Sequence, residues 1–150
     1  MNFSGKNVFV AGGTSGINLA IAEAFATDGA RVAVLSRKPE KVETACAYLQ
    51  GLGGEALGFA ADVRDFAAVE QALSNMAKTW GPIDVVISGA AGNFVAAASD
   101  MSASAFKTVV DIDLLGTFNV LRAAWPHLTK RGREIGLSLI EIAAREQAAH

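Results

Sequence analysis

The chain has 150 residues, of which 51% are hydrophobic, and its 13 basic and 15 acidic residues leave a net charge of −2. A chain of this length can bury a core large enough to fold without disulfides or a structural metal. No apolar run approaches the roughly 20 residues of a membrane span, and Lys and Arg are not clustered as nucleic-acid binding requires. We therefore expect one soluble domain, residues 1–150, with no metal site and no membrane or nucleic-acid partner.

Short apolar stretches alternate with amphipathic ones through the first 88 residues. The predicted order is strand 7–11, helix 17–27, strand 32–35, helix 39–50, strand 56–60, helix 65–79 and strand 83–88. Strands that alternate with helices through short glycine-containing turns form βαβ units, in which parallel strands carry helices on both faces. The sequence therefore predicts an α/β fold with a doubly wound parallel sheet.

The pattern changes after residue 100. Residues 102–130 predict one long helix that Gly116 and Pro126 weaken locally. Residues 137–142 can form a fifth buried strand, but 134–149 also fit a helix, and we favour the strand. A wide apolar stripe along the long helix consists of Phe106, Val109, Val110, Leu114, Phe118, Leu121 and Trp125.

A glycine-rich turn follows the first predicted strand and opens the first helix. Glycines allow a dinucleotide's pyrophosphate to approach the backbone N–H groups and the positive end of that helix. A tight βα turn with no ligand is the structural alternative, but the position between strand and helix favours binding. The sheet is thus predicted to be of the Rossmann type. The residues expected to contact the cofactor here are Gly12, Thr14, Ser15, Gly16 and Ile17.

The end of the second strand predicts which dinucleotide binds. An acidic side chain there would accept a hydrogen bond from the ribose 2′-OH of NAD(H), but the sequence carries Ser36, Arg37 and Lys38 instead. These side chains can hydrogen-bond and neutralise a 2′-phosphate. We therefore predict NADP(H) as the cofactor, although two solvated basic residues leading into a helix would look the same.

These residues resemble the short-chain dehydrogenase/reductase family, whose first turn reads Thr-Gly-x-x-x-Gly-x-Gly. Gly12 and Gly16 match that pattern, whereas Ala11 replaces the usual Thr and Asn18 the usual last Gly. In this family the Asp that follows the third strand contacts adenine, which implies that role for Asp62 with Val63. The turn after the fourth strand resembles the family's Asn-Asn-Ala-Gly turn and implies further cofactor contacts from Ala90, Ala91 and Gly92.

Residues 90–94, 105–109, 111–113 and 116–119 resemble the 2,4-dienoyl-CoA reductase branch, particularly its peroxisomal type. The resemblance covers about residues 5–130. It implies hydride transfer from NADPH to an enoyl thioester of coenzyme A, with Asn93 and Phe94 at the substrate. A carbonyl–alcohol oxidoreductase of the same family is the alternative.

Asp113 is the catalytic candidate that this resemblance implies, because the wider family has an Asn there and the dienoyl-CoA branch can carry Asp. An Asp bonded to nearby backbone within a helix is the alternative. The family's Tyr-x-x-x-Lys pair finds no counterpart, since the only tyrosine is Tyr48 and no lysine follows Lys130. We therefore expect a fold without its last strands and helices, and no appreciable turnover by these 150 residues.

Three hypotheses follow: part of a longer oxidoreductase, a cofactor-binding module without catalysis, or a truncated chain that assembles structurally. The apolar stripe would lack its usual cover, so we expect a homo-oligomer. Cys46 cannot form an internal disulfide, and residues 1–6 leave no room for a secretion signal before the first strand. These features predict a cytoplasmic protein with Cys46 in a packing role.

Overall fold

A parallel sheet forms the centre of the computed structural model, which describes residues 3–93, 95–128 and 137–138. Within these residues the sheet has five strands in the order β3-β2-β1-β4-β5. The strands are β1 (Asn7–Ala11), β2 (Arg31–Ser36), β3 (Ala56–Ala60), β4 (Val85–Ser88) and β5 (Leu137–Ser138). The described part of the chain thus has the predicted doubly wound parallel sheet.

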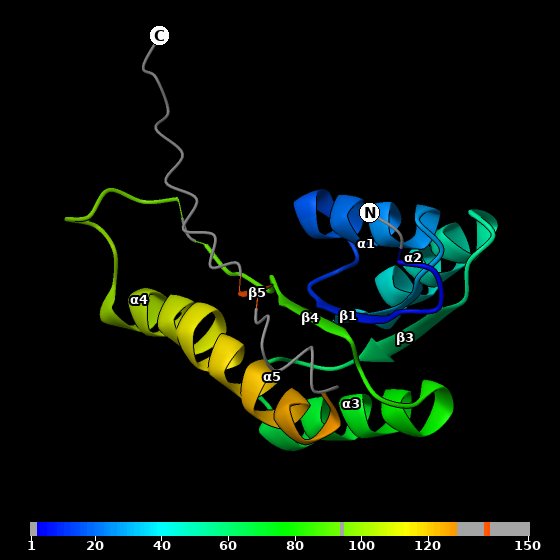
Figure 1. Cartoon of the computed structure of the whole chain (residues 1–150). Helices are drawn as coiled ribbons and strands as arrows, with labels where there is room; N and C mark the ends of the chain where they lie inside the picture. The colour runs from blue at the N-terminus through cyan, green and yellow to red at the C-terminus, as the bar shows by residue number, and fades with distance from the viewer. Residues whose placement is uncertain (1–2, 94, 129–136, 139–150) are drawn as a thin grey trace, which may run out of the picture.

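Helices cover both faces of the sheet. Figure 1 shows α1 and α2 on one face and α3 and α5 on the other. An apolar core lies on each side: Val8 and Val10 of β1 pack beneath α1 and α2, while Phe9 packs against α3 and α5. The helices are α1 (Gly16–Thr27), α2 (Pro39–Gly51), α3 (Phe66–Trp80), α4 (Ala103–Val110) and α5 (Gly116–Ala124).

The strand order reverses between β1 and β4. The chain runs outward from β1 through β2 to β3, then returns past β1 to add β4 on its other side. At such a reversal the turns after neighbouring strands diverge and leave a crevice at their carboxyl ends. The turns after β1, β2, β3 and β4, which carry the predicted cofactor residues, all lie at this edge.

The predicted long helix is wrong in detail. A π-helical segment, Asp111–Leu115, separates α4 from α5, and a 3₁₀ turn, Trp125–His127, contains the weak point at Pro126. A π turn has one residue more than an α turn, so residues before and after it no longer share the stripe of a continuous helix. Ile112, Val120 and Ala124 face the core instead.

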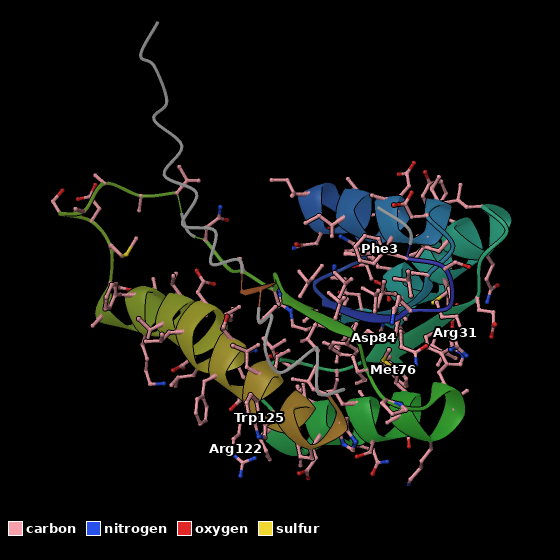
Figure 2. The ribbon with its side chains drawn as sticks, viewed as in Figure 1. Phe3, Arg31, Met76, Asp84, Arg122 and Trp125 are labelled. Atoms are coloured by element: carbon pink, nitrogen blue, oxygen red, sulfur yellow. The ribbon has the colours of Figure 1, made fainter. Side chains whose placement is uncertain are left out.

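Much of the predicted stripe is exposed in the described structure. The side chains of Phe106 and Phe118 are each 60% exposed and that of Leu114 is 58% exposed. Figure 2 shows Met76 pointing from α3 toward the sheet, whereas Arg122 and Trp125 lie on the side of the molecule away from it. The helix pair α4 and α5 therefore presents a row of apolar side chains outward.

The remaining boundaries differ little from those predicted. Strand β4 begins at Val85 rather than residue 83, because Ile83 instead forms an isolated bridge with Leu128. Asp65 precedes α3 and caps it by accepting a hydrogen bond from the Ala68 N–H. Strand β5 falls within the segment predicted as strand 137–142, while the rest of 134–149 lies outside the described residues.

Candidate functional site

The turn between β1 and α1 has the backbone shape expected of an anion-binding loop. Gly12 and Gly16 adopt φ values of +80° and +57°, which side chains with a Cβ rarely tolerate. Ser15 precedes α1 without any side-chain hydrogen bond to the first-turn N–H groups. A Cβ on Gly16 would meet no heavy atom within 4 Å. The space beside Gly16 is thus open at the positive end of α1, a geometry that fits a phosphate group.

A cavity of about 320 Å³ extends from this turn along the carboxyl edge of the sheet. It joins turns that are far apart in the sequence, because parallel strands end at the same edge. All the predicted cofactor residues except Gly92 line it. The lining consists of Gly12, Thr14, Ser15, Gly16, Ile17, Asn18, Leu35, Ser36, Arg37, Lys38, Lys41, Ala61, Asp62, Val63, Gly89, Ala90, Ala91 and Ile112.

One end of the cavity is strongly basic. Arg37 and Lys38 follow β2, and Lys41 joins them from the first turn of α2. All three side chains are exposed. Lys41 was not among the cofactor residues predicted from the sequence, although its place three residues after Lys38 at the start of a helix puts both on the same side. Three cations can thus approach an anionic group at this end.

Asp62 also lines the cavity, in a bidentate ion pair with Arg64. Arg64 Nη2 donates to Asp62 Oδ2 at 2.6 Å and Arg64 Nε donates to Oδ1 at 3.0 Å. The hydrogen bond from the Arg64 side chain lowers the pKa of the Asp62 carboxyl, and the charge of Arg37 adds to the effect. Asp62 is therefore a fixed, ionised acceptor in the lining of the cavity.

The next residue, Val63, is held from behind. Asn119 of α5 donates from Nδ2 to the Val63 carbonyl oxygen at 2.9 Å. Gly116 crosses so close to Val63 that a Cβ there would lie 2.6 Å from the Val63 side chain. The turn after β3 is thus fixed by α5, which keeps the adjoining wall of the cavity in place.

Asp113 lies in the π-helical segment and holds the turn after β4. Its Oδ1 accepts a hydrogen bond from the Gly92 N–H at 2.8 Å. This is a bond to distant rather than local backbone, and π-helical turns occur frequently at functional sites. Among the described residues neither Asp113 nor Asn93 lines the cavity, and Asn93 is exposed. Phe94, predicted with Asn93 at the substrate, lies outside the described residues.

The described residues contain no group of three or more His, Cys, Asp or Glu side chains that could hold a metal ion. None of the described helices is both long enough and apolar enough to cross a membrane.

Comparison with known proteins identifies the family. The family model for short chain dehydrogenases matches residues 6–139. The chain belongs to the short chain dehydrogenase family. Members of this family are oxidoreductases that bind a nicotinamide cofactor. The family match and the described parallel sheet confirm the resemblance and the Rossmann-type fold expected from the sequence.

Several relatives carry the name of one enzyme. The chain is 37% identical over 145 residues to the peroxisomal 2,4-dienoyl-CoA reductase of Arabidopsis thaliana, covering 93% of this chain and 49% of that protein. It is 42% identical over 140 residues to the Rattus norvegicus protein of the same name, covering 93% and 47%. The chain thus spans about half the length of the curated relatives it matches.

Solved structures of the family superpose on the described fold. A short chain dehydrogenase from Burkholderia cenocepacia, in complex with NADP, matches with a TM-score of 0.79 and 29% identity, covering 85% of this chain and 53% of that one. An NAD⁺-bound xylitol dehydrogenase matches with a TM-score of 0.81 and 30% identity, covering 85% and 49%. Neighbours with either dinucleotide therefore share the fold, and the choice between them depends on individual side chains.

Proposed function

We propose that this chain is the cofactor-binding part of an NADP(H)-dependent oxidoreductase. The observation that carries the proposal is the composition of one cavity, which joins a glycine turn at a helix N-terminus to a basic end without an acid after β2. A glycine turn at a helix N-terminus binds pyrophosphate, and a basic end without an acid favours a 2′-phosphate over a free 2′-OH.

Each part of the cavity fits one part of the dinucleotide. The turn at residues 12–17 would hold the pyrophosphate, and Arg37 with Lys38, Lys41 and Ser36 would hold the 2′-phosphate. Asp62 would accept a hydrogen bond from the adenine amine beside Val63, and Ala90 and Ala91 would contact the ribose. When bound, NADP(H) supplies or accepts the hydride. The protein's own part is to orient the cofactor and to exclude water from its reactive end.

For the complete protein we propose a 2,4-dienoyl-CoA or similar enoyl thioester as substrate. The relatives that bear this name and the residues 90–94 and 111–119 support the assignment. Asp113 is the catalytic candidate, placed beside the turn that carries Asn93 through its bond to Gly92. The alternative is carbonyl–alcohol oxidoreduction, which the 39% identity over 130 residues to a 3-dehydrosphinganine reductase of Arabidopsis thaliana favours.

Two experiments test this function in the protein as expressed in full. Titration with NADPH and NADH should give markedly tighter binding of NADPH, and equal binding would contradict the role of Arg37. A substrate panel of 2,4-dienoyl-CoA and β-ketoacyl esters should show NADPH oxidation with the dienoyl thioester, whereas turnover of ketones alone would favour the alternative. The isolated 150 residues should show no appreciable turnover, because they contain no Tyr-x-x-x-Lys pair.

We also propose that α4 and α5 take part in a homo-oligomer. The outward row that runs from α4 through the π-helical segment to α5 exposes more than half of Phe106, Leu114 and Phe118, and adjoining exposed apolar side chains of this size often mark an interaction surface. Light scattering should find more than one copy per particle, and a strict monomer would refute this. The cytoplasmic location expected from the sequence stays a prediction, and peroxisomal import, as the relatives' names suggest, is the competing one. Imaging of the tagged protein would decide between them.

A further inference from the structure

Asn18 stands in the first turn of α1, where the family pattern has its last glycine, and its side chain lies on the cavity. Its Nδ2 donates a hydrogen bond to the Gly89 carbonyl oxygen at 2.6 Å. Gly89 follows β4, so this bond joins the first and fourth strand turns, 71 residues apart. The bond connects two walls of the same cavity.

Gly89 provides the room that this amide needs. A Cβ on Gly89 would overlap the Asn18 side chain, with the Asn18 Nδ2 only 2.6 Å away. The long side chain at residue 18 and the missing side chain at residue 89 therefore compensate each other sterically.

The turn after β4 is held at three further points. A Cβ on Gly12 would lie 2.9 Å from the Ala90 Cα, so the two backbones touch directly. The Gly89 N–H donates to the Ala11 carbonyl oxygen at 3.1 Å. At the far end of the turn, the Gly92 N–H donates to Asp113. The bond from Asn18 differs from these three contacts because a side chain of α1 supplies it.

We propose that Asn18 is a positioning residue for the cofactor, acting through Gly89. Its amide sets the separation between the N-terminus of α1 and the turn after β4, and that turn reaches Asp113 through Gly92. The inference rests on the proposed function, because it takes the ligand of the cavity to be NADPH. Gly89 is its necessary partner, and a side chain is tolerated at residue 18 or at residue 89, but not at both.

The test is a double-mutant cycle in the full protein with Asn18→Gly, Gly89→Ala and the double variant. NADPH affinity is measured by fluorescence titration, and the unfolding midpoint is measured without cofactor. Asn18→Gly should weaken NADPH binding roughly tenfold, since one hydrogen bond that fixes the wall is lost. Gly89→Ala in the natural protein should also weaken NADPH binding, because the added Cβ displaces the Asn18 amide. In the Asn18→Gly background the same substitution should reduce NADPH affinity much less. Asn75→Gly, on an exposed face of α3 outside the cavity, controls for helix destabilisation.

The outcomes separate this inference from the function beneath it. Wild-type protein that bound neither NADPH nor NADH would overturn both. NADPH affinity left unchanged by Asn18→Gly would overturn the positioning role and leave the proposed function standing. Additive effects of the two substitutions would overturn the compensation. Loss of affinity in Asn18→Gly at an unfolding midpoint close to that of Asn75→Gly supports positioning, because general destabilisation would affect both variants alike.

Discussion

Charge reversal at Arg37 is the most direct test of cofactor choice. Arg37 lines the basic end of the cavity with Lys38 and Lys41. A hydrogen bond between charged groups contributes about 1.5–3 kcal/mol, and solvent exposure of this side chain places it at the low end. Its loss should therefore weaken NADPH binding by more than about tenfold.

Arg37→Asp adds a second effect of opposite sign for the two cofactors. The new carboxylate repels a 2′-phosphate but can accept a hydrogen bond from a 2′-OH, which contributes about 1 kcal/mol to NADH binding. Together these effects should change the NADPH-to-NADH preference by roughly 100-fold. Lys38 and Lys41 remain, so NADPH binding should be weakened rather than abolished.

Calorimetric titration of both dinucleotides at low and physiological salt measures this preference. The natural protein should lose part of its NADPH preference as salt rises, because exposed charges are screened. Lys78→Asp changes the net charge equally, at an exposed residue of α3 outside the cavity, and should leave the preference unaltered. An Arg37→Asp variant that kept the natural NADPH preference would refute the assignment of the basic end to the 2′-phosphate.

Substitutions at three further residues test the site and the packing around it. Arg64→Gln should raise the pKa of Asp62 toward its usual value, which an NMR titration measures. In the natural protein the Asp62–Arg64 pair makes a small contribution to stability at neutral pH, and this contribution is lost as the pH falls through the lowered pKa of Asp62. Gly58→Ala should lower the free energy of unfolding by about 1–3 kcal/mol in urea titrations, because its Cβ would overlap side chains of α2. Asp113→Ala should lower the free energy of unfolding by about 1–3 kcal/mol, because it leaves the Gly92 N–H unpaired. Asp113→Asn keeps an accepting oxygen and should keep most of that stability.

The substitutions at Gly58 and Asp113 have a matched control, and all three predictions have an outcome that would contradict them. Gly51→Ala, where a Cβ would meet no atom within 4 Å, should be tolerated, and an equal loss in both glycine variants would contradict the close packing at Gly58. An unchanged Asp62 titration in Arg64→Gln would show that the ion pair does not set its pKa. Equal destabilisation by Asp113→Asn and Asp113→Ala would show that the carboxylate charge, rather than an accepting oxygen, holds Gly92.

The strands and the glycine turn could be predicted because their signals are local. Buried parallel strands require unbroken apolar runs such as residues 8–11 and 32–35, and the positive φ of Gly12 and Gly16 requires glycine at those positions. The basic pair after β2 could be read in the same way. That these residues bind NADP(H) stays a prediction, which the cavity supports by bringing them together.

The misplaced boundaries depend on contacts between distant segments. The period of apolar residues in 102–130 is that of a continuous helix, but a π-helical segment at Asp111–Leu115 changes which side chains face the sheet. The local sequence carries no strong signal for the π turn, because the contacts made there are with distant residues. Ile112 packs into the core, and Asp113 accepts a hydrogen bond from the Gly92 N–H. Strand β4 likewise begins late because Ile83 pairs with Leu128, a contact across more than 40 residues.

The amino-acid sequence by itself determined the class of fold, the alternation of strands and helices, and the places where a glycine must stand. It did so because hydrophobic period and backbone freedom are properties of neighbouring residues. Only the tertiary structure decided that Arg37, Asp62 and the turn after β4 line one cavity, and that Asn18 fills the space left by Gly89. These are relations across turns, and they exist only once parallel strands have carried those turns to one edge of the sheet.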